Sequence, residues 1–260
     1  MKRFGIIGYP LGHSFSPGYF NEKFRNEGID AVYEKYELAT ITDVQGVIEY
    51  TPELCGFNVT IPYKEKIMSY LDIVAPEARA IGAVNLVKIT HKPGSNEKHL
   101  EGYNTDVIGF MNSIQPLLQP LFHKKALILG TGGASKAANY GLRQLGLDTL
   151  LVSRYHKNNT ITYEQVTPEL LEDYTVIVNC TPKGMAPHFD ECPDIPYEAL
   201  TQHHLLYDLI YNPDETLFLK KGKEQGAIVK NGLEMLLLQA EAGWKIWNTV
   251  HSSQFIIHSS

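Results

Sequence analysis

The strand, glycine turn and helix encoded by residues 124–138 constrain the fold more than any other segment. An apolar, strand-forming run at 126–129 leads directly into Gly130-Thr131-Gly132-Gly133 and then into a helical pattern. Gly130 permits the tight turn, Gly132 lets backbone amides approach a pyrophosphate, and the helix N-terminus supplies positive potential. Ser135 replaces the third glycine of the usual GxGxxG pattern. The flanking strand and helix nevertheless favour a dinucleotide site over a purely structural turn.

The rest of the chain alternates short apolar runs with segments long enough for helices. Eight runs are predicted as strands: 4–7, 32–36, 56–59, 83–89, 126–129, 149–152, 176–179 and 205–209. This spacing is typical of an α/β fold with a mostly parallel sheet. The polar segment 91–98 is predicted as a hairpin loop. A final helix is predicted from Leu233 towards Val250, with an apolar face of Leu233, Leu236, Leu237, Ala240, Trp244 and Trp247.

Composition limits the possible function classes. Hydrophobic residues make up 43% and charged residues 20% of the 260 residues, as in globular proteins that bury a core. The net charge of −6 argues against broad nucleic-acid binding. No apolar stretch approaches the roughly 18 residues of a membrane span, so we expect no membrane partner. Three cysteines without a CxxC pair predict packing thiols in a reducing, cytoplasmic compartment, and ten histidines without ligand spacing predict no metal site.

The residues after the strand at 149–152 determine which dinucleotide is predicted. A fold that binds NAD carries an acidic residue about 20 residues beyond the glycine turn. Here Ser153, Arg154 and Lys157 follow the strand, and no carboxylate appears until Glu164. Arg154 can stack on adenine and pair with a 2′-phosphate, and Lys157 can add a point charge. NADP is therefore predicted over NAD, the alternative being that both cations are solvated loop residues.

Small polar residues cluster in apolar surroundings in the N-terminal half. Ser14 and Ser16 follow the first strand, where α/β sheets bind ligands, although a serine-rich turn can also be a helix cap. Strand alternation places Asn58 and Thr60 on one side, with Lys64 just beyond. Asn85 and Asp106 add an amide and a carboxylate, and Gln239 holds a polar amide beside the packed face of the last helix. These residues are candidates for a substrate pocket.

At these residues the chain resembles the shikimate dehydrogenase family. The resemblance rests on the Ser-x-Ser-Pro turn at 14–17, Asn-Val-Thr-x-Pro-x-Lys at 58–64, Gly-Ala-Val-Asn at 82–85, Asn-Thr-Asp at 104–106, the glycine turn at 130–135, and the segments 179–185, 208–213 and 232–240. These segments occur in the family's order and extend over essentially the whole chain. One departure is Ser153-Arg154-Tyr155 in place of the family's Asn-Arg-Thr, and Lys157 lies one position before the family's second cation.

The resemblance implies reversible reduction of 3-dehydroshikimate to shikimate with NADPH, on the route to chorismate and the aromatic amino acids. Lys64 and Asp106 carry over as the catalytic pair. The implied substrate contacts are Ser14, Ser16, Asn58 or its neighbour Thr60, Asn85, Tyr211 and Gln239. The implied cofactor contacts are Gly130, Thr131, Gly132, Gly133, Ala134, Ser135, Ser153, Arg154, Lys157, Thr181, Leu209 and Gly232.

The implied architecture is a discontinuous substrate domain of residues 1–103 and 233–260, with a Rossmann domain at 104–232 between its two parts. The chain is expected to act on a small molecule as a monomer or homodimer. Two other functions stay open. One is a quinate/shikimate dehydrogenase that uses NAD or NADP, and the other is a sensor that binds NADP or a cyclohexene acid without turnover. The presence of both Lys64 and Asp106 argues against the sensor.

Overall fold

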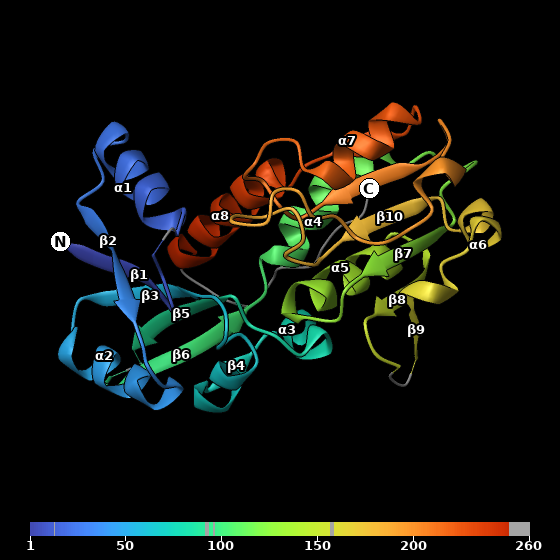
Figure 1. Cartoon of the computed structure of the whole chain (residues 1–260). Coiled ribbons are helices and arrows are strands. Elements are labelled where there is room, and N and C mark those ends of the chain that lie inside the picture. The colour runs from blue at the N-terminus through green and yellow to red at the C-terminus, as the bar shows by residue number, and fades with distance from the viewer. Residues whose placement is uncertain (13, 92–93, 96, 157–158, 250–260) are drawn as a thin grey trace. The chain divides into compact units, whose positions relative to one another are not determined.

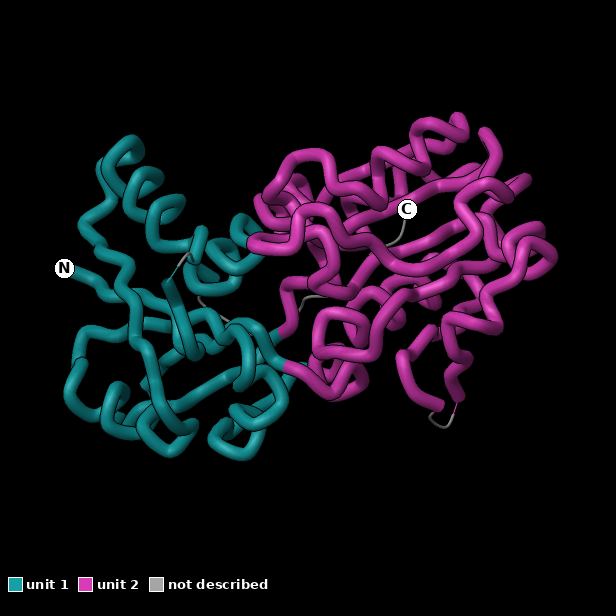
Figure 2. Tube along the Cα trace, viewed as in Figure 1, with its two compact units in different colours: residues 1–75, 84–103, 240–260 teal, residues 76–83, 104–239 magenta. Residues whose placement is uncertain are grey.

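The computed structural model describes residues 1–12, 14–91, 94–95, 97–156 and 159–249. The chain forms two compact units, coloured separately in Figure 2. The first comprises Met1–Ala75, Val84–Tyr103 and the chain from Ala240 onwards, and the second comprises Pro76–Ala83 and Asn104–Gln239. The boundary in the last helix therefore lies between Gln239 and Ala240, seven residues beyond the predicted one, and a short helical segment at 76–83 joins the second unit.

The first unit contains a mixed sheet. Within the described residues its strand order is β2-β1-β3-β5-β6-β4. The strands are β1 (Lys2–Gly8), β2 (Ala31–Glu37), β3 (Leu54–Val59), β4 (Ile73–Val74), β5 (Leu86–His91) and β6 (Lys98–Tyr103), and the helices are α1 (Ser16–Asn26) and α2 (Val44–Tyr50). β1 runs parallel to β2 and β3, whereas β5 is antiparallel to β3 and β6. Short 3₁₀ segments lie at Ile41–Asp43 and Lys66–Tyr70.

An aromatic cluster forms the core on one side of this sheet. Phe4, Phe20, Phe24 and Trp247 are buried, and Trp244 packs against them. The Trp247 indole N–H also donates to the carbonyl of Val87 at 3.0 Å. Both tryptophans come from the last helix, α8 (Leu233–Asn248, Figure 1), so residues 240–248 of α8 belong to the first unit.

The second unit contains a parallel sheet in the order β12-β11-β10-β7-β8-β9. Its strands are β7 (Lys125–Leu129), β8 (Asp148–Ser153), β9 (Thr160–Thr162), β10 (Val176–Asn179), β11 (Leu205–Asp208) and β12 (Ile228–Lys230). Its helices are α3 (Pro76–Ile81), α4 (Asp106–Ile114), α5 (Gly133–Gln144), α6 (Pro168–Asp173) and α7 (Leu217–Glu224), with short 3₁₀ segments at Gln115–Leu117, Tyr163–Gln165 and Tyr197–Ala199.

The helices of the second unit cover both faces of its sheet, as Figure 1 shows. Ala126 and Ile128 of β7 pack with residues of α4 and α5, whereas Leu127 and Leu129 pack with residues of α6 and α7. The strand order runs one way from β7 to β9 and the other way from β10 to β12. Ligands bind open α/β sheets at the carboxyl ends of the strands beside such a reversal. The topology therefore predicts a ligand site at the carboxyl ends of β7 and β10.

All eight predicted strands occur, and the largest shift of a boundary is at the run 83–89. The run at 83–89 begins as a strand only at Leu86, because the Val84 N–H donates to the Lys64 carbonyl instead of joining the sheet. The loop at 91–98 connects the antiparallel pair β5 and β6, with residues 92, 93 and 96 outside the described part. In α8, Leu233 and Leu237 are 40% and 36% exposed. These two residues of the predicted apolar face are therefore not part of the core.

Candidate active site

The glycine turn adopts the conformation that its sequence requires. Gly130 has φ of +106°, and a Cβ there would lie 3.2 Å from the Cys180 carbonyl oxygen. Gly132 is the N-cap of α5, and a Cβ on it or on Gly133 would meet open space. Because the N-cap Gly132 has no side chain and the space around Gly132 and Gly133 is open, the start of α5 is accessible to a ligand. An exposed helix N-terminus of this kind fits an anionic diphosphate.

A cleft of about 680 Å³ opens in front of this turn. Its lining includes six of the predicted cofactor residues: Gly130, Thr131, Gly132, Ser153, Arg154 and Thr181. Val152, Tyr155, Tyr163, Glu164, Cys180, Pro182, Lys183, Glu191 and Asp194 complete it. The residues present therefore fit a dinucleotide, with a phosphate-binding turn and a guanidinium in one cleft. Lys157 lies outside the described residues.

The other predicted cofactor residues do not line this cleft. The Ser135 hydroxyl donates to the Gly132 carbonyl at 2.6 Å, and the side chain is buried, so it holds the turn closed. Ala134 follows in the first turn of α5. Gly232 N–H donates to the Ile210 carbonyl at 3.0 Å, and a Cβ on Gly232 would collide with the Leu209 backbone. The chain after β11 and the start of α8 are therefore tightly packed.

The far end of the cleft contains charges of both signs. The Arg154 guanidinium lies 5.9 Å from the centroid of the Tyr155 ring, which is 72% exposed. Glu164 lines the same cleft because β9 pairs with β8 and Ser153 lies opposite Thr162. The spacing rule excluded Glu164 because it lies too far along the sequence. The short strand β9, which the apolar pattern did not predict, places this carboxylate at the cleft.

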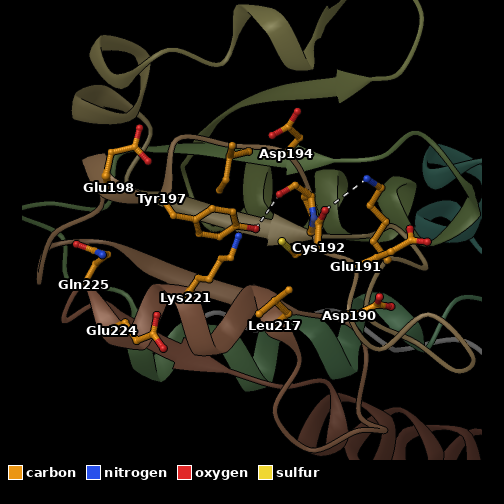
Figure 3. A pocket seen from close by; sticks show the side chains of 13 residues that line it. Asp190, Glu191, Cys192, Asp194, Tyr197, Glu198, Leu217, Lys221, Glu224 and Gln225 are labelled. Carbon is orange, nitrogen blue, oxygen red and sulfur yellow. Dashed lines mark hydrogen bonds between the residues drawn. The ribbon is translucent and has the colours of Figure 1, made fainter.

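A second cavity, of about 740 Å³, lies between residues 190–198 and α7. Figure 3 shows Lys221 against the Tyr197 ring, 4.7 Å from its centroid, and the Tyr197 hydroxyl donating to the Pro193 carbonyl. The lining carries the carboxylates Asp190, Glu191, Asp194, Glu198 and Glu224 against the cations Lys183 and Lys221. This excess of negative charge is unfavourable for an anionic ligand. The glycine turn lines only the first of these two cavities.

In the first unit, Tyr33 holds one predicted substrate residue, Asn58. Its buried hydroxyl donates to Asn58 Oδ1 at 2.6 Å, and Ser16 is buried at the start of α1. Burial raises the pKa of Tyr33 well above its usual value, so the hydroxyl stays protonated. The Asn58 amide donates to the Asn85 carbonyl at 3.3 Å. Tyr33 belongs to a strand with no local motif, and only the pairing of β2 with β1 brings it here.

Three further candidates lie at turns of the same unit. The Ser14 hydroxyl donates to the Leu11 carbonyl at 3.1 Å. Thr60 follows β3, and its backbone N–H donates to Ile7 at 3.0 Å. Lys64 is half-buried in the turn after β3, and its carbonyl accepts the Val84 N–H at 2.8 Å. The bond to Val84 fixes the backbone that carries the Lys64 ammonium.

In the second unit, Asp106 is presented by the start of α4. The carboxamide of buried Asn104 accepts the Val107 N–H at 3.1 Å and donates to the Ala83 carbonyl at 2.9 Å. Asp106 is half-buried in the first turn, where a carboxylate is stabilised by the helix dipole. The Thr105 hydroxyl donates to Gln239 Oε1 at 3.3 Å, and Gln239 is buried. Tyr211 is half-buried, and burial raises its pKa.

Residues 6–87 match the family model described as the shikimate dehydrogenase substrate binding domain. A curated relative from Carboxydothermus hydrogenoformans, named shikimate dehydrogenase (NADP(+)), is 39% identical over 96% of this chain and 92% of its own length. The chain belongs to the shikimate dehydrogenase family.

Solved structures of the shikimate dehydrogenase family share the fold. The crystal structure of the Aquifex aeolicus enzyme has a TM-score of 0.81 at 35% identity, over 95% of this chain and 92% of that one. The Thermus thermophilus enzyme, solved in complex with NADP(H) and shikimate, has a TM-score of 0.81 at 30% identity, over 95% and 94% of the two chains. The fold prediction, an α/β chain with a Rossmann-type part, is confirmed.

The described residues contain no group of three or more histidine, cysteine or acidic side chains placed to hold a metal ion. In the same part of the chain, no helix combines the length and the apolar character needed to cross a membrane. The three cysteines are unpaired and half-buried, each packed against a hydrophobic core cluster, as predicted.

Proposed function

We propose that this chain catalyses the NADP(H)-dependent, reversible interconversion of 3-dehydroshikimate and shikimate, in the reductive direction as a step towards chorismate. The observation that carries the proposal is the cleft in which the Gly130 turn and Arg154 occur together. The turn fits the diphosphate, and Arg154 fits a 2′-phosphate by a charge-assisted, bidentate contact. NADP(H) supplies the hydride when bound.

Lys64 is the proposed proton donor and acceptor. Reduction of the 3-keto group creates an alkoxide, and a protonated lysine at hydrogen-bond distance stabilises that charge and then gives up its proton. In the oxidative direction the same amine takes the hydroxyl proton. Asp106, held at the start of α4 by the Asn104 cap, would orient the ammonium and accept a substrate hydroxyl. Both side chains are proposed here as the catalytic pair.

The remaining polar groups are proposed as substrate contacts. Hydroxyl and amide side chains suit a polyhydroxylated carboxylate, because each ring oxygen needs a partner once water is excluded. In this assignment Ser14, Ser16, Asn58, Thr60, Asn85, Tyr211 and Gln239 bind the substrate. Gly130 to Ser135, Ser153, Arg154, Lys157, Thr181, Leu209 and Gly232 serve the cofactor, with Ser135 acting through the shape of the turn.

The domain division and the setting are also proposals. We assign residues 1–103 with 233–260 to a substrate domain and 104–232 to a dinucleotide domain, supported by two compact units with similar bounds. Three unpaired thiols favour a reducing, cytoplasmic compartment. Light scattering coupled to size exclusion distinguishes the monomer from the homodimer.

The deciding experiment measures NADPH absorbance after mixing purified protein with shikimate or quinate and with NADP or NAD. We expect NADPH formation with shikimate and NADP, and a lower kcat/KM for the other three combinations. Comparable turnover of quinate would instead indicate a quinate/shikimate dehydrogenase. Tight binding of NADP and shikimate without turnover would contradict the proposed enzyme and indicate a sensor.

A further inference from the structure

A buried carboxylate ends strand β11 close to the cofactor cleft. Asp208 is fully buried, and it pairs in the sheet with Asn179, the last residue of β10. Within the described part of the chain, its hydrogen-bond donors Asn179, Ile210 and Thr216 are all neutral. A buried carboxylate without a counter-ion must be held by neutral donors.

Three neutral donors from three segments converge on this carboxylate. Asn179 Nδ2 donates to Oδ1 at 3.0 Å, and the Ile210 N–H donates to the same oxygen at 3.0 Å. The Thr216 hydroxyl donates to Oδ2 at 2.6 Å and is also the N-cap of α7. Asp208 therefore links the end of β10, the chain after β11 and the start of α7.

Asn179 in turn hydrogen-bonds residues that line the cleft. Its Oδ1 accepts both the backbone N–H of Thr181, at 3.0 Å, and the Thr181 hydroxyl, at 2.7 Å. Its Nδ2 also donates to the Lys183 carbonyl at 3.4 Å. Thr181 and Lys183 line the cleft in front of the glycine turn. The Asn179 amide meets all these partners only when Oδ1 faces Thr181 and Nδ2 faces Asp208 and Lys183. The carboxylate of Asp208, which accepts from Nδ2, favours this orientation.

We propose that Asp208 is a positioning residue for the cofactor: through Asn179 it presets the Thr181–Lys183 wall of the cleft, and through Ile210 it fixes the chain that follows β11. This inference rests on the proposed NADP(H) site. Asp208 does not line that cleft itself.

Stability alone does not account for this carboxylate. Burial raises its pKa to about 6, which means that the folded chain bears a cost for the charged form at neutral pH. Apolar side chains of similar volume often replace buried charges with no loss of stability. What an apolar side chain cannot do is accept hydrogen bonds from Asn179, Ile210 and Thr216 together. The carboxylate therefore contributes orientation.

The first test replaces Asp208 with asparagine and measures NADPH binding from the fluorescence of NADPH, without turnover. In Asp208→Asn the Oδ1 atom can still accept from Asn179 and Ile210, but the bonds lose their ionic component and the new amide faces Thr216. We expect the Kd for NADPH to rise about fivefold, with the melting temperature unchanged or higher. In steady-state assays the rise should fall on KM for NADP more than on kcat.

A second pair of variants covers the case in which Asp208→Asn fails to fold. Thr216→Val removes both the bond to Asp208 and the N-cap of α7, whereas Thr167→Val removes only the similar N-cap of α6, where Thr167 accepts the Leu170 N–H. Both should lower the melting temperature by a few degrees. We expect only Thr216→Val to raise the Kd for NADPH, about threefold.

The outcomes separate this inference from the proposed function. An unchanged Kd in Asp208→Asn, or equal Kd values in Thr216→Val and Thr167→Val, would overturn the positioning role while leaving the cofactor site intact. Failure of the wild-type chain to bind NADPH would overturn the cofactor assignment and, with it, this inference.

Discussion

The candidate cofactor cleft and the polar cluster of the first unit are constructed from different parts of the chain. In the cleft the main chain dominates: the glycine turn, the exposed start of α5 and the backbone N–H of Thr181 define it. In the first unit side chains dominate, with Tyr33 of β2 hydrogen-bonded to Asn58 of β3. A main-chain site is set by local sequence, whereas a side-chain site depends on which strands lie together. Substitutions in the cleft should therefore change cofactor affinity, whereas substitutions in the first unit should change turnover or KM for the substrate.

The largest effect is expected from a single side chain of the first unit. Lys64→Ala should lower kcat by roughly 10²- to 10⁴-fold with a smaller change in KM for shikimate, because the proposed proton transfer is lost while other contacts remain. Steady-state kinetics with shikimate and NADP measures this. Lys66→Ala, two residues on and exposed, is the matched control and should keep near wild-type turnover. A loss of tenfold or less in Lys64→Ala would exclude the acid/base role.

A backbone change should have the largest effect on the cleft. Gly130→Ala forces a Cβ into positive φ and towards the Cys180 carbonyl, so we expect NADPH affinity to fall more than tenfold and stability to fall by about 1–2 kcal/mol. Gly146→Ala, at φ +83° with open space around its Cβ, is the control for backbone strain alone. Fluorescence titration and urea unfolding should show lost stability in both and lost affinity in Gly130→Ala alone. Equal affinities would contradict the main-chain model.

Removing one hydroxyl should test the side-chain cluster. Tyr33→Phe removes the hydrogen bond to Asn58 Oδ1, so KM for shikimate should rise about three- to tenfold and stability should fall by about 1 kcal/mol. Tyr36→Phe, on the same strand, removes a hydroxyl that contacts Glu34 and should leave KM unchanged. If both variants had the same KM, Tyr33 would be structural only.

Buried histidines of the second unit should make the free energy of unfolding fall as the pH is lowered. His123 and His204 each accept a backbone N–H at Nδ1 and face a carbonyl with Nε2, and burial lowers the pKa of both below the usual 6.5. Their contribution to stability is therefore complete above pH 6.5 and is lost as the pH falls through the lowered values.

Urea unfolding at pH 7.5 and 5.5 measures this loss, and His204→Gln should reduce it. The raised pKa of Asp208, about 6 against 3.8, acts in the opposite direction, because the cost of its buried charge disappears as the pH falls from 6 towards 3.8. Asp208→Asn should therefore steepen the loss on acidification. Identical pH dependence in wild type and His204→Gln would contradict the histidine assignment.

The smallest effect is expected from a carboxylate in the cleft. Glu164 shares the cleft with Arg154 and would repel a 2′-phosphate. Glu164→Gln should therefore lower KM for NADP about two- to threefold and leave KM for NAD nearly unchanged. Glu169→Gln, an exposed acid at the start of α6, is the control. A rise in KM for NADP would show that Glu164 supports the cofactor.

The cofactor turn was predictable because its spacing, glycines and flanking elements occupy fifteen consecutive residues. The role of Ser135 was not, because its short bond back to Gly132 depends on the curvature of the turn. Tyr33, Asn104 and Glu164 were missed for a common reason. Strand pairing places Tyr33 and Glu164, and the start of a helix places Asn104. These features cannot be predicted from a short window of sequence. The same holds for the exposed Leu233 and Leu237, whose helical spacing predicted burial.

The two tryptophans of the chain, Trp244 and Trp247, both belong to the aromatic cluster of the first unit. Intrinsic tryptophan emission therefore reports on that unit alone, without any label. The second unit can be followed by the binding of NADPH, whereas far-UV circular dichroism reports on the secondary structure of both units. Denaturation monitored by both signals would reveal whether the two units unfold as one cooperative system or in separate transitions.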